Sequence, residues 1–190
     1  MKDNLRIAIL FTVVTTVLFG IIYPLAVTGL AQILFPSQAN GSLLTRDGRV
    51  IGSKLIGQAF SGPGYFHPRP SNAGTGYDAT QSSGSNLGPT NHLLLDRVKA
   101  DVERLHAENP SGPVPIDLIT SSGSGLDPEI SPAAANFQVP RIVKERGMSE
   151  ADLRALVQKH TLGRQLGFLG EARVRVLELN VELDAVHPLK

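Results

Sequence analysis

Two glycine- and serine-rich stretches have the composition of loops that hold phosphate groups. They read SGSNLG from Ser83 to Gly88 and SSGSGL from Ser121 to Leu126. A phosphate-binding P-loop also needs a lysine after its second glycine, and both stretches lack it. After the second stretch, Asp127 adds negative charge and Pro128 removes a backbone donor. We therefore interpret this stretch as leading into a type I turn and then a helix capped by Ser131.

Nucleophilic and metal chemistry have weaker support. Ser124 is not flanked as in the Gly-x-Ser-x-Gly nucleophile elbow, so a membrane-anchored serine hydrolase would need a histidine and an aspartate from elsewhere and is a distant alternative. None of the five histidines lies three or four residues from another, and the chain has no cysteine. We therefore predict no catalytic residue and no metal site.

A third candidate combines aromatic and basic side chains with prolines that fix an extended backbone. The stretch from Tyr65 to Ser71 reads YFHPRPS, and Tyr65, Phe66 and Arg69 are residue types that anchor protein interfaces. The alternative is that Tyr65 and Phe66 hold their own loop on the core. Both interpretations stay open, and both can hold at once with one ring in each role.

These candidates need elements to position them, and the N-terminus is the clearest element. The apolar run from Ile7 to Phe35 would reach about 43 Å as a helix, whereas a bilayer core needs about 30 Å. A cleaved signal peptide would have a shorter apolar region, and a buried core helix would have a polar face. We predict a membrane-spanning helix at about residues 7–30 of a segment 1–35, kinked or ended near Pro24. It includes Ile7, Phe11, Val14, Leu18, Ile22, Tyr23 and Pro24.

Charge sets the remaining limits. The 190 residues carry a formal charge of +1, which gives no case for nucleic-acid binding. Lys2 and Arg6 lie closer to the apolar run than the basic residues from Arg46 onward, so the positive-inside rule predicts a cytoplasmic N-terminus. We therefore expect residues 36–190 to form a soluble extracytoplasmic domain.

This domain has the pattern of a mixed α+β fold. Asp47-Gly48 between short apolar runs predicts a hairpin over residues 43–51. Residues 61–91 are rich in Gly, Pro and Ser, yet they carry Tyr65 and Tyr77, so we expect a long ordered loop held by its aromatic rings.

Caps and apolar spacing predict three helices. One is capped by Asn91 and runs over residues 92–107, one is capped by Ser131 and ends at Gly147 with a break or kink at Pro140, and one is capped by Ser149 and runs over 150–160. Alternation predicts a strand over 114–120. Residues 174–183 fit strand or helix, because their alternation changes parity and needs a bulge or a change of element near Leu177.

Seven motifs occur in order along nearly the whole chain: YP at residues 23–24, GSKLIGQAF at 52–60, YFHPRPS at 65–71, SGSNLG at 83–88, SGSGLDP at 122–128, QVPR at 138–141 and VLELN at 176–180. With these motifs the chain resembles the KdpC family, the C subunits of bacterial high-affinity potassium-transporting P-type ATPase complexes. One departure is Arg175, where we expect the family to have asparagine.

The resemblance implies an accessory, non-hydrolytic subunit of an ATP-driven potassium uptake complex in the bacterial cytoplasmic membrane. Its partners would be a channel-like potassium-selective subunit, the P-type ATPase subunit and the lipid bilayer. The subunit would stabilise the assembly and couple or regulate these partners. The residues implied in partner contact are Tyr65, Phe66, Arg69, Gln138 and Arg141.

The resemblance also carries an alternative role, that of a catalytic chaperone that binds ATP and raises the ATP affinity of the ATPase subunit. No tightly bound cofactor is implied. The residues proposed for nucleotide contact are Ser83, Gly84, Ser85, Asn86, Ser122, Gly123, Ser124, Gly125 and Asp127. The two roles differ in sidedness, because ATP is cytoplasmic whereas the charge rule places residues 36–190 outside. An outer domain near the channel mouth would act through a coupling between distinct sites, by gating or guiding potassium entry.

Overall fold

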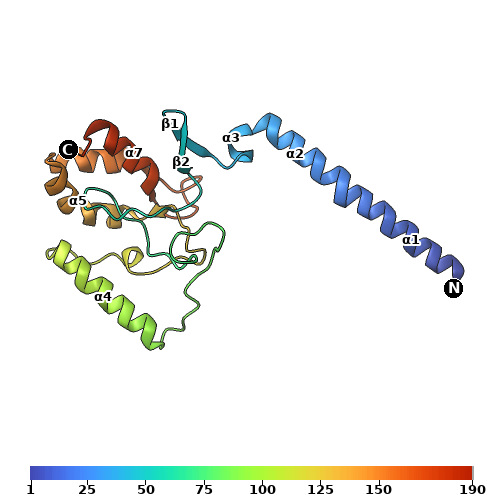
Figure 1. The fold of residues 1–190 in the computed structure, drawn as a ribbon, viewed down its shortest axis with the longest axis horizontal. Helices are drawn as coiled ribbons and strands as arrows, with labels where there is room; N and C mark the ends of the chain where they lie inside the picture. Colours follow the sequence, from blue (N-terminus) through green and yellow to red (C-terminus); the bar gives the residue numbers. More distant parts are fainter. Residues whose placement is uncertain (190) are drawn as a thin grey trace. The chain divides into compact units, whose positions relative to one another are not determined.

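The computed structural model describes residues 1–189, and its two compact units are Met1–Val50 and Ile51–Lys190 (Figure 1). These units divide after Val50, and the boundary predicted after residue 35 lies one residue beyond Leu34, where the long apolar helix ends. In chain order the elements are α1 (Lys2–Val17), a π-helical turn (Leu18–Ile22), α2 (Tyr23–Leu34), α3 (Pro36–Ala39), β1 (Leu43–Arg46), β2 (Arg49–Ser53), α4 (His92–Glu108), the 3₁₀ helix η2 (Ile116–Leu118), β3 (Glu129–Ile130), α5 (Pro132–Arg146), α6 (Glu150–Lys159), β4 (Thr161–Leu162), β5 (Arg173–Arg175) and α7 (Val176–Val186).

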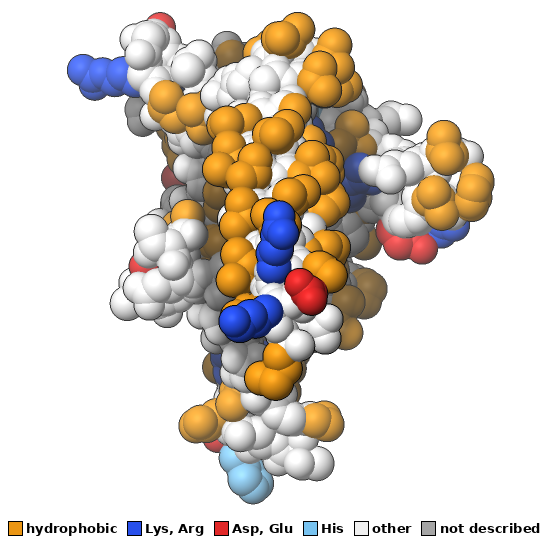
Figure 2. All heavy atoms as spheres, turned by 90° about the vertical axis from the view of Figure 1, so that its right-hand side faces the viewer, with side chains coloured by type: hydrophobic (Ala, Val, Ile, Leu, Met, Phe, Trp, Pro, Cys, Tyr) orange, Lys and Arg blue, Asp and Glu red, His pale blue; other side chains and the backbone are white. Residues whose placement is uncertain are grey.

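The N-terminal helix runs from Lys2 to Leu34, and by its length and composition it can cross a membrane. Figure 2 shows hydrophobic side chains gathered along this helix, with charged side chains near its start. The helix widens into a π-helical turn at Leu18–Ile22, directly before Tyr23 and Pro24. Pro24 has no N–H and its ring crowds the preceding turn, so a wider turn here keeps the helix continuous. Pro24 therefore alters the helix without ending it.

The predicted hairpin turn and the predicted helix caps are confirmed. Asp47 and Gly48 join β1 to β2 with φ of 51° and 75°, as in the two-residue turns that match strand twist. Each of the three predicted helices is capped by a side-chain oxygen that accepts a hydrogen bond from a backbone N–H of the first turn. The capping residues are Asn91 for α4, Ser131 for α5 and Ser149 for α6.

The core of the second unit joins α5, α6 and α7 to a three-stranded antiparallel sheet of order β3-β5-β4. Val174 in the central strand pairs with Ile130 on one side and Thr161 on the other. The helices contribute side chains with no exposed surface, at helical spacing, namely Val139, Ile142, Leu153, Leu179 and Leu183. Three amphipathic helices thus bury a short sheet.

The strand predicted over residues 114–120 is wrong. The segment forms η2 instead, in which the Leu118 N–H donates to the Pro115 carbonyl at 3.1 Å. Asp117 accepts hydrogen bonds from the backbone N–H and the hydroxyl of Ser131 at 2.7 and 3.1 Å. A strand would place Ile116 and Leu118 on the same face, whereas in this turn Leu118 is buried and Ile116 is exposed.

Residues 174–183 change from strand to helix, as the parity of their alternation required. Strand β5 ends at Arg175 and α7 starts at Val176, one residue before the predicted position. Positions 176, 179, 180 and 183 are all buried, which is the spacing of one helix face.

Two other turn and break predictions are corrected. Helix α5 does not break at Pro140, and a kink there stays a prediction; Pro140 lies on the exposed side of the helix, where the carbonyl left without a partner can be hydrated. Asp127 and Pro128 do not form a type I turn but lead directly into β3. The Asp127 carboxylate there accepts the Glu129 N–H at 3.0 Å, because an aspartate can replace a turn with its own side chain.

Candidate functional site

The candidate residues meet at the long loop between β2 and α4, which runs across α5 and α7 (Figure 1). Asn180 of α7 is 1% exposed, and its amide accepts from the Phe66 N–H and donates to the Phe66 carbonyl, both at 2.9 Å. Gln138 of α5 does the same for His67, at 2.8 and 3.1 Å. Two buried amides therefore hold consecutive loop residues as a neighbouring strand would, and Phe66 is fully buried.

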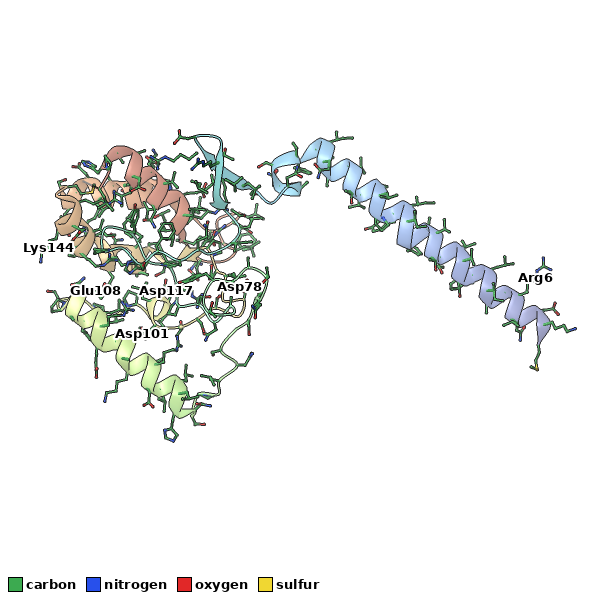
Figure 3. All side chains as sticks on the ribbon, viewed as in Figure 1. Arg6, Asp78, Asp101, Glu108, Asp117 and Lys144 are labelled. Atoms are coloured by element: carbon green, nitrogen blue, oxygen red, sulfur yellow. The ribbon has the colours of Figure 1, made fainter. Side chains whose placement is uncertain are left out.

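Arg141 holds the residues just before this point. Its guanidinium donates to the carbonyls of Pro63 and Tyr65 and to the Gln138 side chain. It also forms an ion pair at 3.0 Å with Glu108, which lies at the end of α4 (Figure 3). Burial lowers the pKa of Arg141, and the Glu108 carboxylate opposes that shift. Arg141 therefore ties the loop to both α5 and α4.

A second arginine fixes the Tyr65 side chain. The Arg146 side chain is fully buried, pairs with Asp184 at 2.8 Å and donates to the Gly64 carbonyl at 2.7 Å. Its guanidinium carbon lies 4.9 Å from the centroid of the Tyr65 ring, and the Tyr65 hydroxyl donates to Asp184 at 3.2 Å. The ring thus packs within its own chain through a cation–π contact and a hydrogen bond.

The electrostatics of the loop favour a neutral His67. Burial lowers the pKa of His67, and the nearby Arg141 lowers it further. Its Nε2 lies 2.9 Å from the Gly62 carbonyl oxygen. A carbonyl oxygen only accepts hydrogen bonds, so Nε2 must carry the hydrogen. The neutral tautomer with hydrogen on Nε2 satisfies both conditions.

Arg69 joins the loop to the second glycine- and serine-rich stretch. It pairs with Asp127 at 2.9 Å and donates to the Thr120 carbonyl at 3.3 Å. Its own carbonyl accepts the Tyr77 hydroxyl at 2.6 Å, and burial raises the pKa of Tyr77 to about 12. Asp127, whose negative charge argued against a phosphate site, is thus paired with Arg69.

The two glycine- and serine-rich stretches lie against each other. The Ser83 N–H donates to the Ser124 carbonyl at 3.0 Å, and the Ser71 hydroxyl donates to the Gly125 carbonyl at 2.6 Å. Gly125 has a φ of 67°, and a Cβ at this position would lie 2.5 Å from the Ser83 carbonyl oxygen. Only glycine therefore permits this approach.

The predicted nucleotide residues are brought together only in part. Ser83 and Gly84 contact the stretch from Ser122 to Gly125. Ser85 and Asn86 make no hydrogen bond to that stretch within residues 1–189; Ser85 accepts the N–H of a neighbouring residue, and Asn86 is exposed with a φ of 52°.

The surroundings do not fit a triphosphate. A depression of about 240 Å³ beside Asp127 has four carboxylates and two arginines in its lining, namely Asp117, Asp127, Glu129, Glu171, Arg69 and Arg173. Both arginines are paired, Arg69 with Asp127 and Arg173 with Glu129, each at 2.9 Å. A phosphate needs free cations or free backbone donors, and the backbone of the two stretches is partly used in joining them. ATP contact stays a prediction that this arrangement does not favour.

The Ser124 hydroxyl contacts residues of its own stretch. It accepts the Leu126 N–H at 3.1 Å and lies 3.4 Å from the Ser122 hydroxyl. Within residues 1–189 no histidine forms a hydrogen bond with Ser124, and no group of three or more His, Asp or Glu side chains is placed to hold a metal ion.

Sequence reasoning missed Asn180, Arg146 and Asp184 as individual contributors. Asn180 was an available signal, because it lies at helical spacing from the apolar Val176 and Leu183 and a buried amide in a helix needs partners. The predicted contact residues Phe66, Gln138 and Arg141 all bond inside the chain, so a structural role is now assigned to them. Their predicted role toward partners stays a prediction.

Comparison with known proteins agrees with the motifs. Residues 5–185 match the family model KdpC, described as K⁺-transporting ATPase, c chain. The chain is 59% identical over 189 residues to the Potassium-transporting ATPase KdpC subunit of Koribacter versatilis, an alignment that covers 100% of this chain and 98% of the relative. It is 56% identical to the subunit of the same name from Acidobacterium capsulatum, with 97% and 100% covered, and 55% identical to that of Caulobacter vibrioides, with 99% and 96% covered.

Proposed function

Because the chain belongs to the KdpC family, the c chains of K⁺-transporting ATPases, we propose that it is an accessory subunit that stabilises the pump and couples its channel-like and ATP-hydrolysing subunits. The observation that carries this role is that residues of the family motifs bond to one another inside the chain. They build a rigid body around one loop rather than an open catalytic cleft, and they include Tyr65, Phe66, Arg69, Gln138 and Arg141.

The mechanism we infer is that of an anchored docking body. The apolar helix fixes the chain in the membrane beside its partners, which raises the effective concentration of the second unit at their surface. The second unit then binds without ordering its loop, because Asn180 and Gln138 already hold it, so little conformational entropy is lost on docking. Such a body can shift its partners between states by binding one state more tightly.

We place the chain in the bacterial cytoplasmic membrane with its N-terminus inside and residues 36–190 outside. Charge flanking the helix supports this orientation, with Lys2 and Arg6 close to it. The chain has no cysteine, so Asn4→Cys and Ser111→Cys each introduce one label site, on opposite sides of the helix. In intact spheroplasts a membrane-impermeant maleimide should label Ser111→Cys and spare Asn4→Cys. The reverse pattern contradicts the orientation.

The function is tested by removing the second unit. A chain shortened to residues 1–50 keeps the whole first unit, whereas a full deletion removes both. In membranes that contain the other subunits, we expect the shortened chain to weaken K⁺-dependent ATP hydrolysis and K⁺ affinity relative to the full chain. Equal K⁺ affinity with the shortened and full chains would show that residues 51–190 do not couple the partners.

The alternative, direct ATP contact that raises the ATP affinity of the pump, has one point of support, namely that Ser83 lies against Ser124 as two parts of one site would. The paired arginines argue against it. Photolabelling of the complex with 8-azido-ATP distinguishes the two. Label on this chain that Ser83→Ala and Ser124→Ala abolish would favour the chaperone role, and label confined to the ATPase subunit would favour the docking role.

A further inference from the structure

One part of the second unit exposes large apolar side chains outside the loop and its anchors. Between β4 and β5 the chain forms a hairpin over residues 162–170, called here the apolar hairpin. Leu166 is 83% exposed and Phe168 is 68% exposed, and Leu162 and Leu169 are exposed beside them. Scattered exposed leucines are ordinary, but four apolar side chains on one nine-residue hairpin form a patch.

The backbone presents this patch in a fixed shape. The Gln165 N–H donates to the Leu169 carbonyl at 2.9 Å, and the Leu169 N–H donates back at 2.9 Å. Arg164 and Glu171 close the base with contacts of 2.9 and 2.7 Å. The apolar hairpin is therefore ordered before any partner binds.

The tip is held in a costly conformation. Leu166 has a φ of 52° and Gly167 a φ of 82°. The left-handed region costs a residue with a Cβ about 1–2 kcal/mol, and leucine lacks the local hydrogen bonds by which asparagine or aspartate tolerates it. An exposed leucine at this position is unfavourable in both backbone and solvation terms in the free chain. A partner that buries Leu166 would offset both.

Charge around the patch indicates the kind of partner. Arg164 pairs with Glu171, Arg173 pairs with Glu129, and Arg175 pairs with both Glu129 and Glu178. An anionic membrane surface attracts unpaired Lys and Arg, whereas these cations already have carboxylate partners within residues 1–189. A neutral rim around aromatic and aliphatic anchors is the composition of a protein interface.

We propose that the apolar hairpin docks into an apolar socket on the extramembrane surface of a partner subunit of the same K⁺-transporting ATPase complex, with Leu166 and Phe168 as the anchors. This inference rests on the proposed function as an assembly subunit. It adds the contact surface and the chemistry of the socket, which must be apolar at its centre and uncharged or evenly charged at its rim.

Crosslinking in native membranes tests the contact directly. The full chain carries the photoreactive residue p-benzoylphenylalanine at Phe168 and is produced together with its partner subunits. The matched control places it at Leu93 of α4, which is 70% exposed. We expect a covalent adduct with a partner subunit from Phe168 in at least tenfold higher yield than from Leu93. Adducts with lipid alone, no adduct, or equal yields from both positions would each overturn the proposal.

A second measurement separates docking from folding. Leu166→Asp combined with Phe168→Asp places two charges at the anchors, and Leu93→Asp is the control. We expect partner subunits to co-purify with the double variant at least tenfold less than with the full chain, as for an interface centre, and within twofold for the control. Resistance of the long loop between β2 and α4 to chymotrypsin should be unchanged in both variants. Unchanged co-purification of the double variant overturns the proposal while leaving the proposed function intact, whereas loss of co-purification in a chain without the second unit bears on the function alone.

Discussion

The two hydrogen bonds from Asn180 to the long loop predict how much stability the loop loses when this side chain is removed. Asn180→Ala removes both hydrogen bonds to Phe66, each 2.9 Å long and buried. Each backbone group left without a partner costs about 1–3 kcal/mol, and water that enters the space of the lost amide recovers part of that cost. We therefore expect the loop to lose about 2–4 kcal/mol of stability against local opening.

Local opening is measurable by proteolysis, because chymotrypsin cuts after aromatic residues and Phe66 is fully buried. When opening and closing are fast relative to cleavage, the cleavage rate follows the open population. A loss of 2–4 kcal/mol corresponds to a rate increase of about 30- to 900-fold, since about 1.4 kcal/mol is tenfold. The control is Asn136→Ala, an amide on α5 that bonds to the Pro132 carbonyl and to Arg154 and not to the loop. It should change the rate less than threefold.

Gln138→Ala extends the test, because this amide holds the next residue, His67. If both amides hold one segment, releasing Phe66 already frees most of what Gln138 secures. The double variant should then cost about 1 kcal/mol less than the sum of the single variants. Strict additivity, or an Asn180→Ala rate within threefold of the unchanged chain, would refute the reasoning that two amides grip one loop.

Gly125→Ala should lower the free energy of unfolding by about 2–4 kcal/mol in urea titrations, because this position combines a left-handed φ with a 2.5 Å clash. A Cβ at Gly123 would meet nothing within 4 Å, so Gly123→Ala should cost less than about 1 kcal/mol. Equal effects of the two substitutions would contradict the close packing of Gly125 against Ser83. The pKa of His67 is lowered by burial and by Arg141, so between its folded pKa and 6.5 the unfolded chain binds more protons, and stability should fall as pH drops below about 6.5. His67→Gln should remove that slope and His92→Gln, at an exposed position, should keep it.

Features encoded by neighbouring residues were predicted from sequence. Asn91, Ser131 and Ser149 cap their helices because a cap needs only the next three residues. That the 61–91 loop is ordered was also predicted correctly, because aromatic rings among glycines and prolines indicate a loop anchored on the core, and Phe66 is fully buried.

Features that depend on distant partners were not. Asn180 binds Phe66 across 114 positions and Gln138 binds His67 across 71, so no spacing rule links them. Strands β3 and β4 have two residues each, too few for a period of two to register. In 114–120 the structure does not keep the strand-like alternation, because Ile116 is exposed and Leu118 is buried in a turn whose Asp117 bonds to the distant Ser131.

The most specific sequence motifs and the proposed contact surface thus lie in different parts of the second unit. The motifs around Phe66, Gln138 and Asn180 form hydrogen bonds inside the chain, whereas the apolar side chains of Leu166 and Phe168 face solvent. Variants of the first group should therefore lower stability and assembly together, because they loosen the body that docks. Variants at the apolar hairpin should lower assembly alone. If Asn180→Ala abolished partner binding while the chymotrypsin resistance of the loop stayed unchanged, the buried amides would be acting on a partner directly, and the assignment of motif to scaffold and hairpin to contact would have to be reversed.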